Sequence, residues 1–315
     1  MSDQRAPGQR GVRLFVRATR AKVLPVMLAP VAVGAAVAWE RSGSLSWWRF
    51  ALTAVGAAGM HLGANVINDI YDEESGAEVR ARADFKSLAT GSGVLGAGLM
   101  SRQRLLGLAA ALFGTGLACA AALAIGGRPH VLWLGAIGFV LAYEYVGPPL
   151  RYGTVGRGLG EIGIFVAFGI LPVAGSYYVQ AAAIDAAALW ASLVPGLLTT
   201  MVLYHHHFLH WESDRAVGKM TPVAALKPQI GLVVGRIALI ATTIVLAAQT
   251  LVFALFPPGA FAAALAFVPV AIAQRSAAGE PGNEAYVRLL GATLGAAVLV
   301  AGVLVASAMV RVALR

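Results

Sequence analysis

The chain has 315 residues, of which 58% are hydrophobic and 12% charged, and its mean hydropathy is +0.74. This apolar content exceeds that of soluble globular domains and indicates a polytopic membrane protein. The formal net charge of +9 does not imply nucleic acid as a partner, because most basic residues lie in loops beside apolar segments, where membrane orientation explains them. The single cysteine, Cys119, excludes a disulfide framework and a cysteine-rich metal site.

A helix needs about 20 apolar residues to cross a bilayer, and nine runs approach this length, the fourth and eighth being short. They lie at residues 22–40, 47–68, 105–126, 130–146, 159–180, 186–209, 230–254, 259–273 and 289–310. We therefore expect an all-α protein with nine transmembrane helices, consisting of a basic cytosolic tail over residues 1–21 and a single transmembrane domain over residues 22–315. The glycine pairs Gly231/Gly235 and Gly291/Gly295 predict close helix contacts.

The lysines and arginines predict the orientation in the membrane. With the N-terminus in the cytosol, 18 of them fall on the cytosolic side and five on the outer side, while Arg236 lies within a span. This distribution follows the positive-inside rule. Two polar segments, after the second and sixth runs, are separated by four spans, so both are expected on the cytosolic side and can face each other across one cavity.

The first polar segment ends the second apolar run with two asparagines, Asn65 and Asn68, and two aspartates, Asp69 and Asp72. The aspartates are three residues apart, so on a helix they point in a similar direction. A group of oxygen ligands suits Mg²⁺, which keeps several waters and is completed by substrate phosphates. We expect Asp69 and Asp72 to bind the metal, supported by Asn68 and by Glu78 a little further along the chain. Ionisable groups that continue directly from a membrane helix are costly, which favours a functional role.

The second polar segment follows the sixth run and covers residues 205–219. We expect Asp214 to bind metal, and Arg215 and Lys219 to hold a diphosphate. Lys22, at the start of the first span, is expected to reach the same phosphates. Carboxylates on two facing helix ends, with basic residues beside them, are typical of a diphosphate site bridged by magnesium.

These residues resemble a known family. Asn68-Asp69-x-x-Asp72 and Asp214-Arg215-x-x-Gly218-Lys219 resemble the motifs of the UbiA superfamily of intramembrane prenyltransferases. The stretches at 22–31, 157–161 and 175–180 are similar to its 1,4-dihydroxy-2-naphthoate prenyltransferases of menaquinone biosynthesis. The resemblance covers residues from about 20 to 230. It implies nine helices around a cytosol-facing cavity that opens toward lipid, Mg²⁺ as cofactor, and a polyprenyl diphosphate and an aromatic acceptor as substrates.

The second motif departs from the family pattern Asn-x-x-x-Asp-x-x-x-Asp, because His206 and His210 stand before Asp214. Three interpretations are open for these histidines. They bind or exchange protons with the acceptor, they recruit a transition metal through their four-residue spacing, or they are structural. His205 and His207 are expected to be structural. Glu161, which begins the fifth run, is a further candidate for substrate binding and for contact with Arg157.

The resemblance implies transfer of a polyprenyl group from its diphosphate to an aromatic acceptor similar to 1,4-dihydroxy-2-naphthoate. The metal withdraws negative charge from the allylic C–O bond, and the electron-rich ring captures the resulting cation. Two alternatives keep the same fold, namely a different acceptor and a cyclase without an acceptor. A third alternative is a divalent-metal transporter in which the carboxylates, His206 and His210 bind the cargo.

Overall fold

The computed structural model describes residues 7–74 and 91–315, and all regular structure in these ranges is helical. The first part contains α1 (Pro7–Ala18), the 3₁₀ turn η1 (Ala21–Val23), α2 (Pro25–Ser42), α3 (Trp47–Glu74), α5 (Arg102–Ile125), α6 (Val131–Glu144) and α7 (Tyr152–Val155). The middle part contains α8 (Leu159–Phe165), the π-helical turn η2 (Val166–Ile170), α9 (Leu171–Ala181), α10 (Ala186–His206), the 3₁₀ turn η3 (His207–Leu209) and α11 (Trp211–Ala216). The last part contains α12 (Pro222–Ala247), the π-helical turn η4 (Ala248–Val252), the 3₁₀ helix η5 (Pro258–Ala266), α13 (Phe267–Gly279) and α14 (Asn283–Ala313).

Within these ranges, eight helical segments are long and apolar enough to cross a membrane. They are Ala21–Ser42, Trp47–Glu74, Arg102–Ile125, Leu159–Ala181, Ala186–Leu209, Pro222–Val252, Pro258–Gly279 and Asn283–Ala313. The remaining expected run, the fourth, forms α6, which has 14 residues and is about 21 Å long, shorter than a hydrocarbon core of about 30 Å. The chain is therefore an all-helical polytopic membrane protein, with eight candidate spans among the residues that the structure describes.

Short polar residues between the apolar runs start several of these helices. The side chains of Ser101, Asp185 and Thr221 accept hydrogen bonds from backbone N–H groups in the first turns of α5, α10 and α12, at 3.3, 3.1 and 3.3 Å. Such caps satisfy donors that have no partner within the helix. At the other end of α2, Gly43 has a φ of 72°, a left-handed conformation that glycine adopts without strain.

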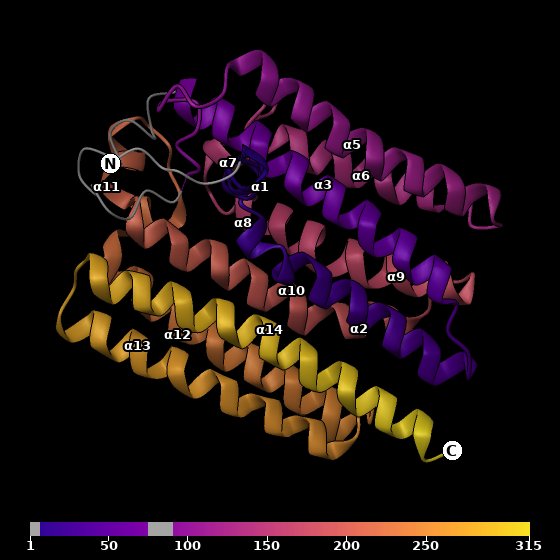
Figure 1. The fold of residues 1–315 in the computed structure, drawn as a ribbon. Coiled ribbons are helices and arrows are strands. Elements are labelled where there is room, and N and C mark those ends of the chain that lie inside the picture. Colours follow the sequence, from indigo (N-terminus) through magenta and orange to yellow (C-terminus); the bar gives the residue numbers. More distant parts are fainter. Residues whose placement is uncertain (1–6, 75–90) are drawn as a thin grey trace.

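The helices pack in one bundle, with α3, α5 and α6 on one side, α12 to α14 on the other, and α2, α9 and α10 between them (Figure 1). Some contacts are so close that only glycine fits, since a Cβ on Gly59 of α3 would lie 2.6 Å from the Leu112 carbonyl oxygen of α5. The packing prediction is confirmed for Gly231 and Gly235, whose Cβ positions lie 3.0 Å from side chains of η3 and α10. It is wrong for Gly291 and Gly295, which have no atom of the described chain within 4 Å of that position.

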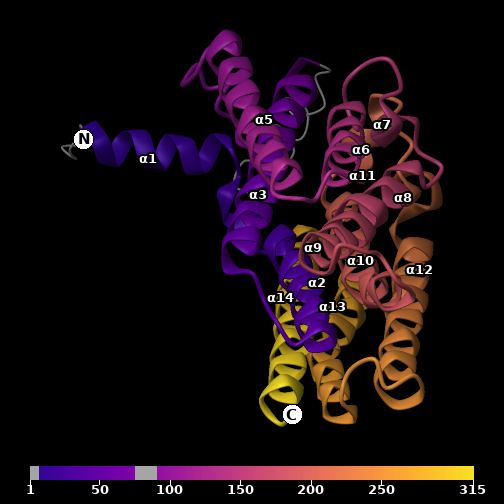
Figure 2. The same ribbon diagram turned by 90° about the vertical axis from the view of Figure 1, so that its right-hand side faces the viewer.

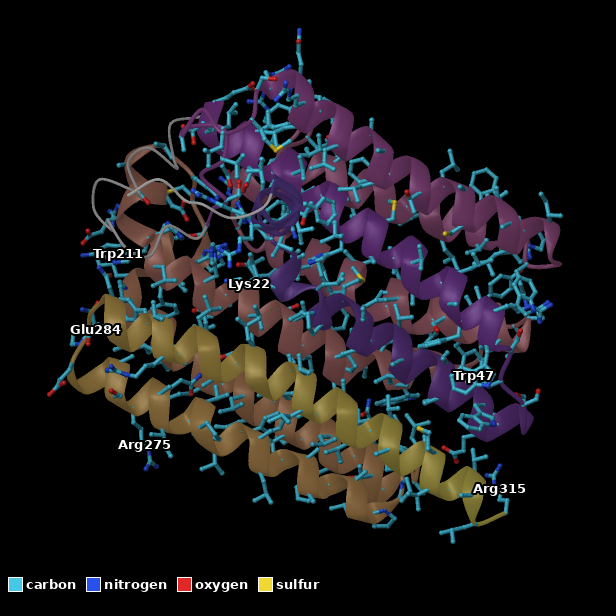
Figure 3. The ribbon with its side chains drawn as sticks, viewed as in Figure 1. Lys22, Trp47, Trp211, Arg275, Glu284 and Arg315 are labelled. Atoms are coloured by element: carbon cyan, nitrogen blue, oxygen red, sulfur yellow. The ribbon has the colours of Figure 1, made fainter. Side chains whose placement is uncertain are left out.

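The C-terminal end of α3 and the short helix α11 lie at the same end of the bundle, whereas the C-terminus lies at the opposite end (Figure 1). The side chains of Trp211 and Glu284 mark the first end, and those of Trp47 and Arg315 mark the second (Figure 3). The two polar segments of the sequence are thus brought to one end. Within the segment expected to be a tail, the structure contains α1, which projects sideways from the bundle (Figure 2).

Candidate active site

A cavity of about 840 Å³ lies among α2, α3, α5, α6, α9 and α10. Six of the expected site residues line it, and they are Asn68, Asp72, His206, His210, Asp214 and Lys219. Most of the other lining residues are apolar. Along α3 the lining extends from Asp72 back to Leu52, which is about 30 Å at the helical rise of 1.5 Å per residue. The cavity therefore has a charged end and a long apolar part, a shape suited to an amphiphilic ligand.

The charged end joins the two sequence motifs. Lys219 Nζ lies 3.6 Å from Asp214 Oδ1, while the buried Asp214 Oδ2 has no hydrogen-bond partner within the described chain. Burial raises the pKa of Asp214, and the negative charge of Asp72 adds to this effect against the opposing charge of Lys219. Burial alone would lower the pKa of Lys219, but Asp72 and Asp214 outweigh it, so this pKa is raised. Asp72 from the first motif thus acts electrostatically on both residues of the second.

Asp69 has a different environment from Asp72. Its carboxylate contacts the Arg20 guanidinium, and Oδ2 accepts a hydrogen bond from the Ser92 backbone N–H at 3.0 Å. Asp69 does not line the cavity, whereas Asn68 does, with its buried Oδ1 lacking a hydrogen-bond partner among the described residues. The structure therefore differs from the expectation that Asp69 and Asp72 point the same way. The pair separated by four residues, Asn68 and Asp72, is 40° apart on an ideal helix and faces the cavity instead.

Three other expected residues that the structure describes do not line the cavity. Lys22, labelled in Figure 3, is exposed and does not line the cavity, and Arg215 is likewise exposed. Glu161 Oε1 lies 3.2 Å from His207 Nδ1, so its neighbour is a histidine and not Arg157 as expected. The two atoms are at ion-pair distance but form no hydrogen bond with each other, and neither has a hydrogen-bond partner among the described residues. Glu78 lies outside the described residues.

The histidines of the second motif divide into two groups. His206 and His210 line the cavity with their ring centroids 4.9 Å apart. His205 points into the core, where its Nδ1 lies 2.8 Å from the Thr293 hydroxyl of α14, so it has the structural role expected. His207 lines the cavity beside Glu161, in addition to any structural role.

The helix that carries these residues is interrupted. α10 ends at His206, and His210 has φ −124° and ψ 5°, outside the helical range, before α11 begins at Trp211. The four-residue spacing of His206, His210 and Asp214 therefore does not lie on one continuous helix. The interruption nevertheless leaves His206, His210 and Asp214 on the same cavity.

The donor atoms present fit a hard cation better than a transition metal. In the part of the chain that the structure describes, no group of three or more His, Cys, Asp and Glu side chains is close enough to hold a metal ion. A transition-metal site built from protein side chains alone has no support in these residues. Mg²⁺ needs fewer protein ligands, because it is often bound by one or two carboxylates together with water and substrate phosphates. The buried oxygen atoms of Asn68 and Asp214 that lack partners match this requirement.

Sequence reasoning missed Arg20, which lines the cavity between the two motifs, and Tyr145, which follows α6 at the same end. The Tyr145 ring meets the Tyr152 ring edge-on, with the ring centroids 5.4 Å apart. The signal for Tyr145 was the group of polar and aromatic residues at the end of the fourth apolar run. Arg20 carried no such signal, since it is one of several arginines before the first span.

His210 leads to a pH prediction. Its burial, with the charges of Lys219, His207 and Arg20, lowers its pKa from 6.5 to about 4. Neutral His210 therefore contributes stability that is fully present above pH 6.5 and is lost as the pH falls toward 4. We expect the loss of unfolding free energy between pH 7.5 and pH 5.0 to be smaller by about 2 kcal/mol in His210→Gln than in wild type.

Thermal unfolding in detergent at the two pH values measures this effect. His130→Gln is the control, because His130 is exposed near the N-terminus of α6, away from Lys219 and Arg20. An equal pH response of wild type and His210→Gln would contradict the lowered pKa.

Comparison with known proteins identifies the family. The sequence profile of the UbiA prenyltransferase family matches residues 27–286. A 2-carboxy-1,4-naphthoquinone phytyltransferase from Synechocystis sp. is 29% identical over 234 residues, covering 73% of this chain and 71% of the relative. A 1,4-dihydroxy-2-naphthoate octaprenyltransferase from Escherichia coli is 30% identical over 214 residues, covering 67% and 68%.

The fold is also found among solved structures. A UbiA homologue from Archaeoglobus fulgidus, bound to GPP and Mg²⁺, has a TM-score of 0.69 and 19% sequence identity, covering 95% of this chain and 99% of the homologue. The helical architecture is thus shared over nearly the whole length. With the profile match extending from the first span into the last, the chain belongs to the UbiA prenyltransferase family.

Proposed function

We propose that this prenyltransferase transfers a polyprenyl group from a polyprenyl diphosphate to 1,4-dihydroxy-2-naphthoate, with Mg²⁺ as cofactor. The observation that carries the proposal is the joining of Asp72 with Asp214 and Lys219 at one end of a cavity whose other lining residues are mostly apolar. A polyprenyl diphosphate is likewise divided into a charged diphosphate group and an apolar hydrocarbon tail. The acceptor is suggested by the naphthoate and naphthoquinone prenyltransferases among the relatives.

The residues at the charged end have complementary tasks. Asp72 and Asp214, with the Asn68 amide oxygen, would hold Mg²⁺, and Lys219 would hold the diphosphate. When bound, Mg²⁺ neutralises charge that develops on the leaving diphosphate. The allylic C–O bond breaks with its electron pair leaving on the diphosphate, a ring carbon of the acceptor bonds to the allylic carbon, and the acceptor carboxylate is lost as carbon dioxide. The apolar walls exclude water that would otherwise capture the allylic cation.

Three further residues fit this chemistry in supporting roles. Asp69, through its contact with Arg20, would fix the turn of α3 that carries Asn68 and Asp72. His206 and His210 would meet the acceptor, and His210, whose lowered pKa of about 4 keeps the ring neutral at neutral pH, would accept a hydrogen bond from an acceptor hydroxyl group. The roles of Lys22, Arg215, Glu161 and Glu78 in binding donor or metal stay predictions.

We also propose the orientation and the membrane setting. The bias of lysines and arginines supports a cytosolic N-terminus and a cytosolic charged end. α6 would be the ninth span, completed by the turns that flank it. An opening of the cavity toward lipid is supported by Leu117, Leu132 and Phe139, which line the cavity yet are 65%, 42% and 42% exposed. Membership of a prenyltransferase family leaves the transporter interpretation without support.

The test is a product assay with the full chain in lipid nanodiscs. Wild type is incubated with Mg²⁺, geranylgeranyl diphosphate and 1,4-dihydroxy-2-naphthoate, and products are identified by mass spectrometry. A prenylated, decarboxylated naphthoquinol is the expected result. Diphosphate release without that product would overturn the acceptor and favour a different acceptor or a cyclase, whereas an untouched donor would overturn the proposal as a whole.

A further inference from the structure

Six glycines of the described residues line the central cavity, and they fall into two classes. Gly56 of α3 and Gly116 of α5 are explained by helix packing. A Cβ on Gly56 would lie 3.1 Å from the Cys119 Cβ, and a Cβ on Gly116 would lie 2.9 Å from the Met60 sulfur atom. These two positions need glycine because α3 and α5 approach each other closely.

The other four glycines have room for a side chain. A Cβ would lie 4.0 Å from the nearest atom at Gly135 and 3.8 Å at Gly138 and Gly175, and at Gly114 it would meet nothing within 4 Å. All four lie inside helices and none has a positive φ. Glycine makes a helix less stable than alanine does. At these four positions neither packing among the described residues nor backbone geometry requires glycine. What the four share is their place on the cavity wall.

Their distance from the charged end can be expressed in isoprene units. Gly135 and Gly138 lie three residues apart on one face of α6. α6 leads into Tyr145 at the charged end, and at 1.5 Å per residue Gly138 and Gly135 lie about 10 and 15 Å from it. Three extended chain bonds span about 3.5 Å, so the four bonds of one isoprene unit span about 5 Å. Gly175 of α9 lies at the level of Gly135, because its nearest neighbour is Leu134.

We propose that Gly135, Gly138 and Gly175 form a subsite for the third and fourth isoprene units of the donor, and that their missing side chains set the tail length the enzyme accepts. The inference rests on the proposed function, since it assumes that the diphosphate lies at the Asp72 and Asp214 end. A side chain at these positions occupies the volume of the distal units and leaves the first two units undisturbed. A leucine side chain is close in size to one isoprene unit, so it displaces about one unit.

The test compares donors of two lengths. Gly135→Leu and Gly138→Leu are made separately in the full chain in nanodiscs, and kcat/KM is measured with geranyl and geranylgeranyl diphosphate. We expect each leucine to lower the ratio of geranylgeranyl to geranyl kcat/KM by about tenfold or more, as for loss of several buried methylene contacts. Geranyl transfer should stay within about twofold of wild type, because the changed positions lie beyond two units. Gly135→Ala and Gly138→Ala, which fit without close contacts, should change the ratio less.

Gly291→Leu is the matched control. Gly291 is also a helical glycine, and a Cβ there would meet none of the described atoms within 4 Å, but it lies on α14 and does not line the cavity. The ratio of geranylgeranyl to geranyl kcat/KM in Gly291→Leu should equal that of wild type. Equal losses with both donors, or an unchanged ratio in the folded leucine variants, would overturn the subsite.

A binding measurement separates this inference from the choice of acceptor. The Kd values of non-hydrolysable geranyl and geranylgeranyl thiolodiphosphates are measured with Mg²⁺ and without acceptor. The leucine variants should weaken binding of the longer analogue selectively, even if 1,4-dihydroxy-2-naphthoate is not the acceptor. Unselective binding would overturn the subsite, and failure of wild type to bind either analogue would overturn the proposed donor.

Discussion

Replacing Asp72 or Asp214 with alanine is expected to lower kcat/KM for prenyl transfer by about 10³-fold or more, close to 4 kcal/mol of transition-state stabilisation. Both carboxylates line the charged end of the cavity and act on the same lysine, Lys219. Each would neutralise part of the charge on a bound cation, and the cation in turn stabilises the leaving diphosphate. Single-turnover kinetics at saturating Mg²⁺ with geranylgeranyl diphosphate measures the chemical step directly.

Asparagine variants separate the metal role from folding. Asp72→Asn keeps the shape of the side chain, and we expect it to raise the Mg²⁺ concentration needed for half-maximal activity. Glu74→Ala is the control, because Glu74 lies two residues further along α3 but pairs with the exposed Arg102 at 2.6 Å. Exposed ion pairs contribute little, so this variant should stay close to wild type. Full activity in folded Asp72→Ala under saturating Mg²⁺ would contradict the assignment of Asp72 as a residue that holds Mg²⁺.

The lengths of the apolar runs in the sequence were sufficient to locate the membrane helices. All nine expected runs are helical in the structure, and segments such as Ala186–Leu209 begin and end where they were expected. The largest shift is in α12, which begins at Pro222 and not near residue 230. The chain there is bent, as Lys227 has φ 67° and ψ 156° immediately before Pro228. Hydrophobicity identifies lipid-facing residues, but it does not detect a helix that continues into the polar segment beyond the membrane.

Residues of the candidate site were predictable only where they belong to a sequence motif at the end of an apolar helix. Asn68, Asp72, Asp214 and Lys219 were found because they stand in recognisable spacings at the ends of apolar runs. Arg20 was missed because its position depends on a left-handed turn, with φ 51° and ψ 36°. No sequence pattern indicates this turn. That turn redirects the chain between α1 and η1 and brings the Arg20 side chain to Asp69, 49 residues away. Lys22, two residues beyond this turn, does not line the cavity.

The contact between Arg20 and Asp69 carries the second large prediction, which concerns stability. The Asp69 side chain is 6% exposed and that of Arg20 is 20% exposed. Removing one partner of a buried pair leaves the other charge without compensation. We expect Arg20→Ala to lower the unfolding free energy by about 2–4 kcal/mol, and Arg20→Ala/Asp69→Ala to lower it by less than the sum of the two single changes. Chemical unfolding in mixed micelles measures the unfolding free energy of wild type, of the two single variants and of the double variant.

The Mg²⁺ requirement of Asp69→Asn then distinguishes two roles for Asp69. If Asp69 only positions α3, the variant loses stability, and its half-maximal Mg²⁺ concentration stays near wild type while that of Asp72→Asn rises. The hydrogen bond from the Ser92 N–H can be kept by the asparagine oxygen, so the helix end retains part of its anchoring. A Mg²⁺ requirement raised equally in both variants would mean that Asp69 leaves Arg20 when the donor binds. The Arg20 contact would then belong to the enzyme without donor, and freed Arg20, which already lines the cavity, would be available to the diphosphate.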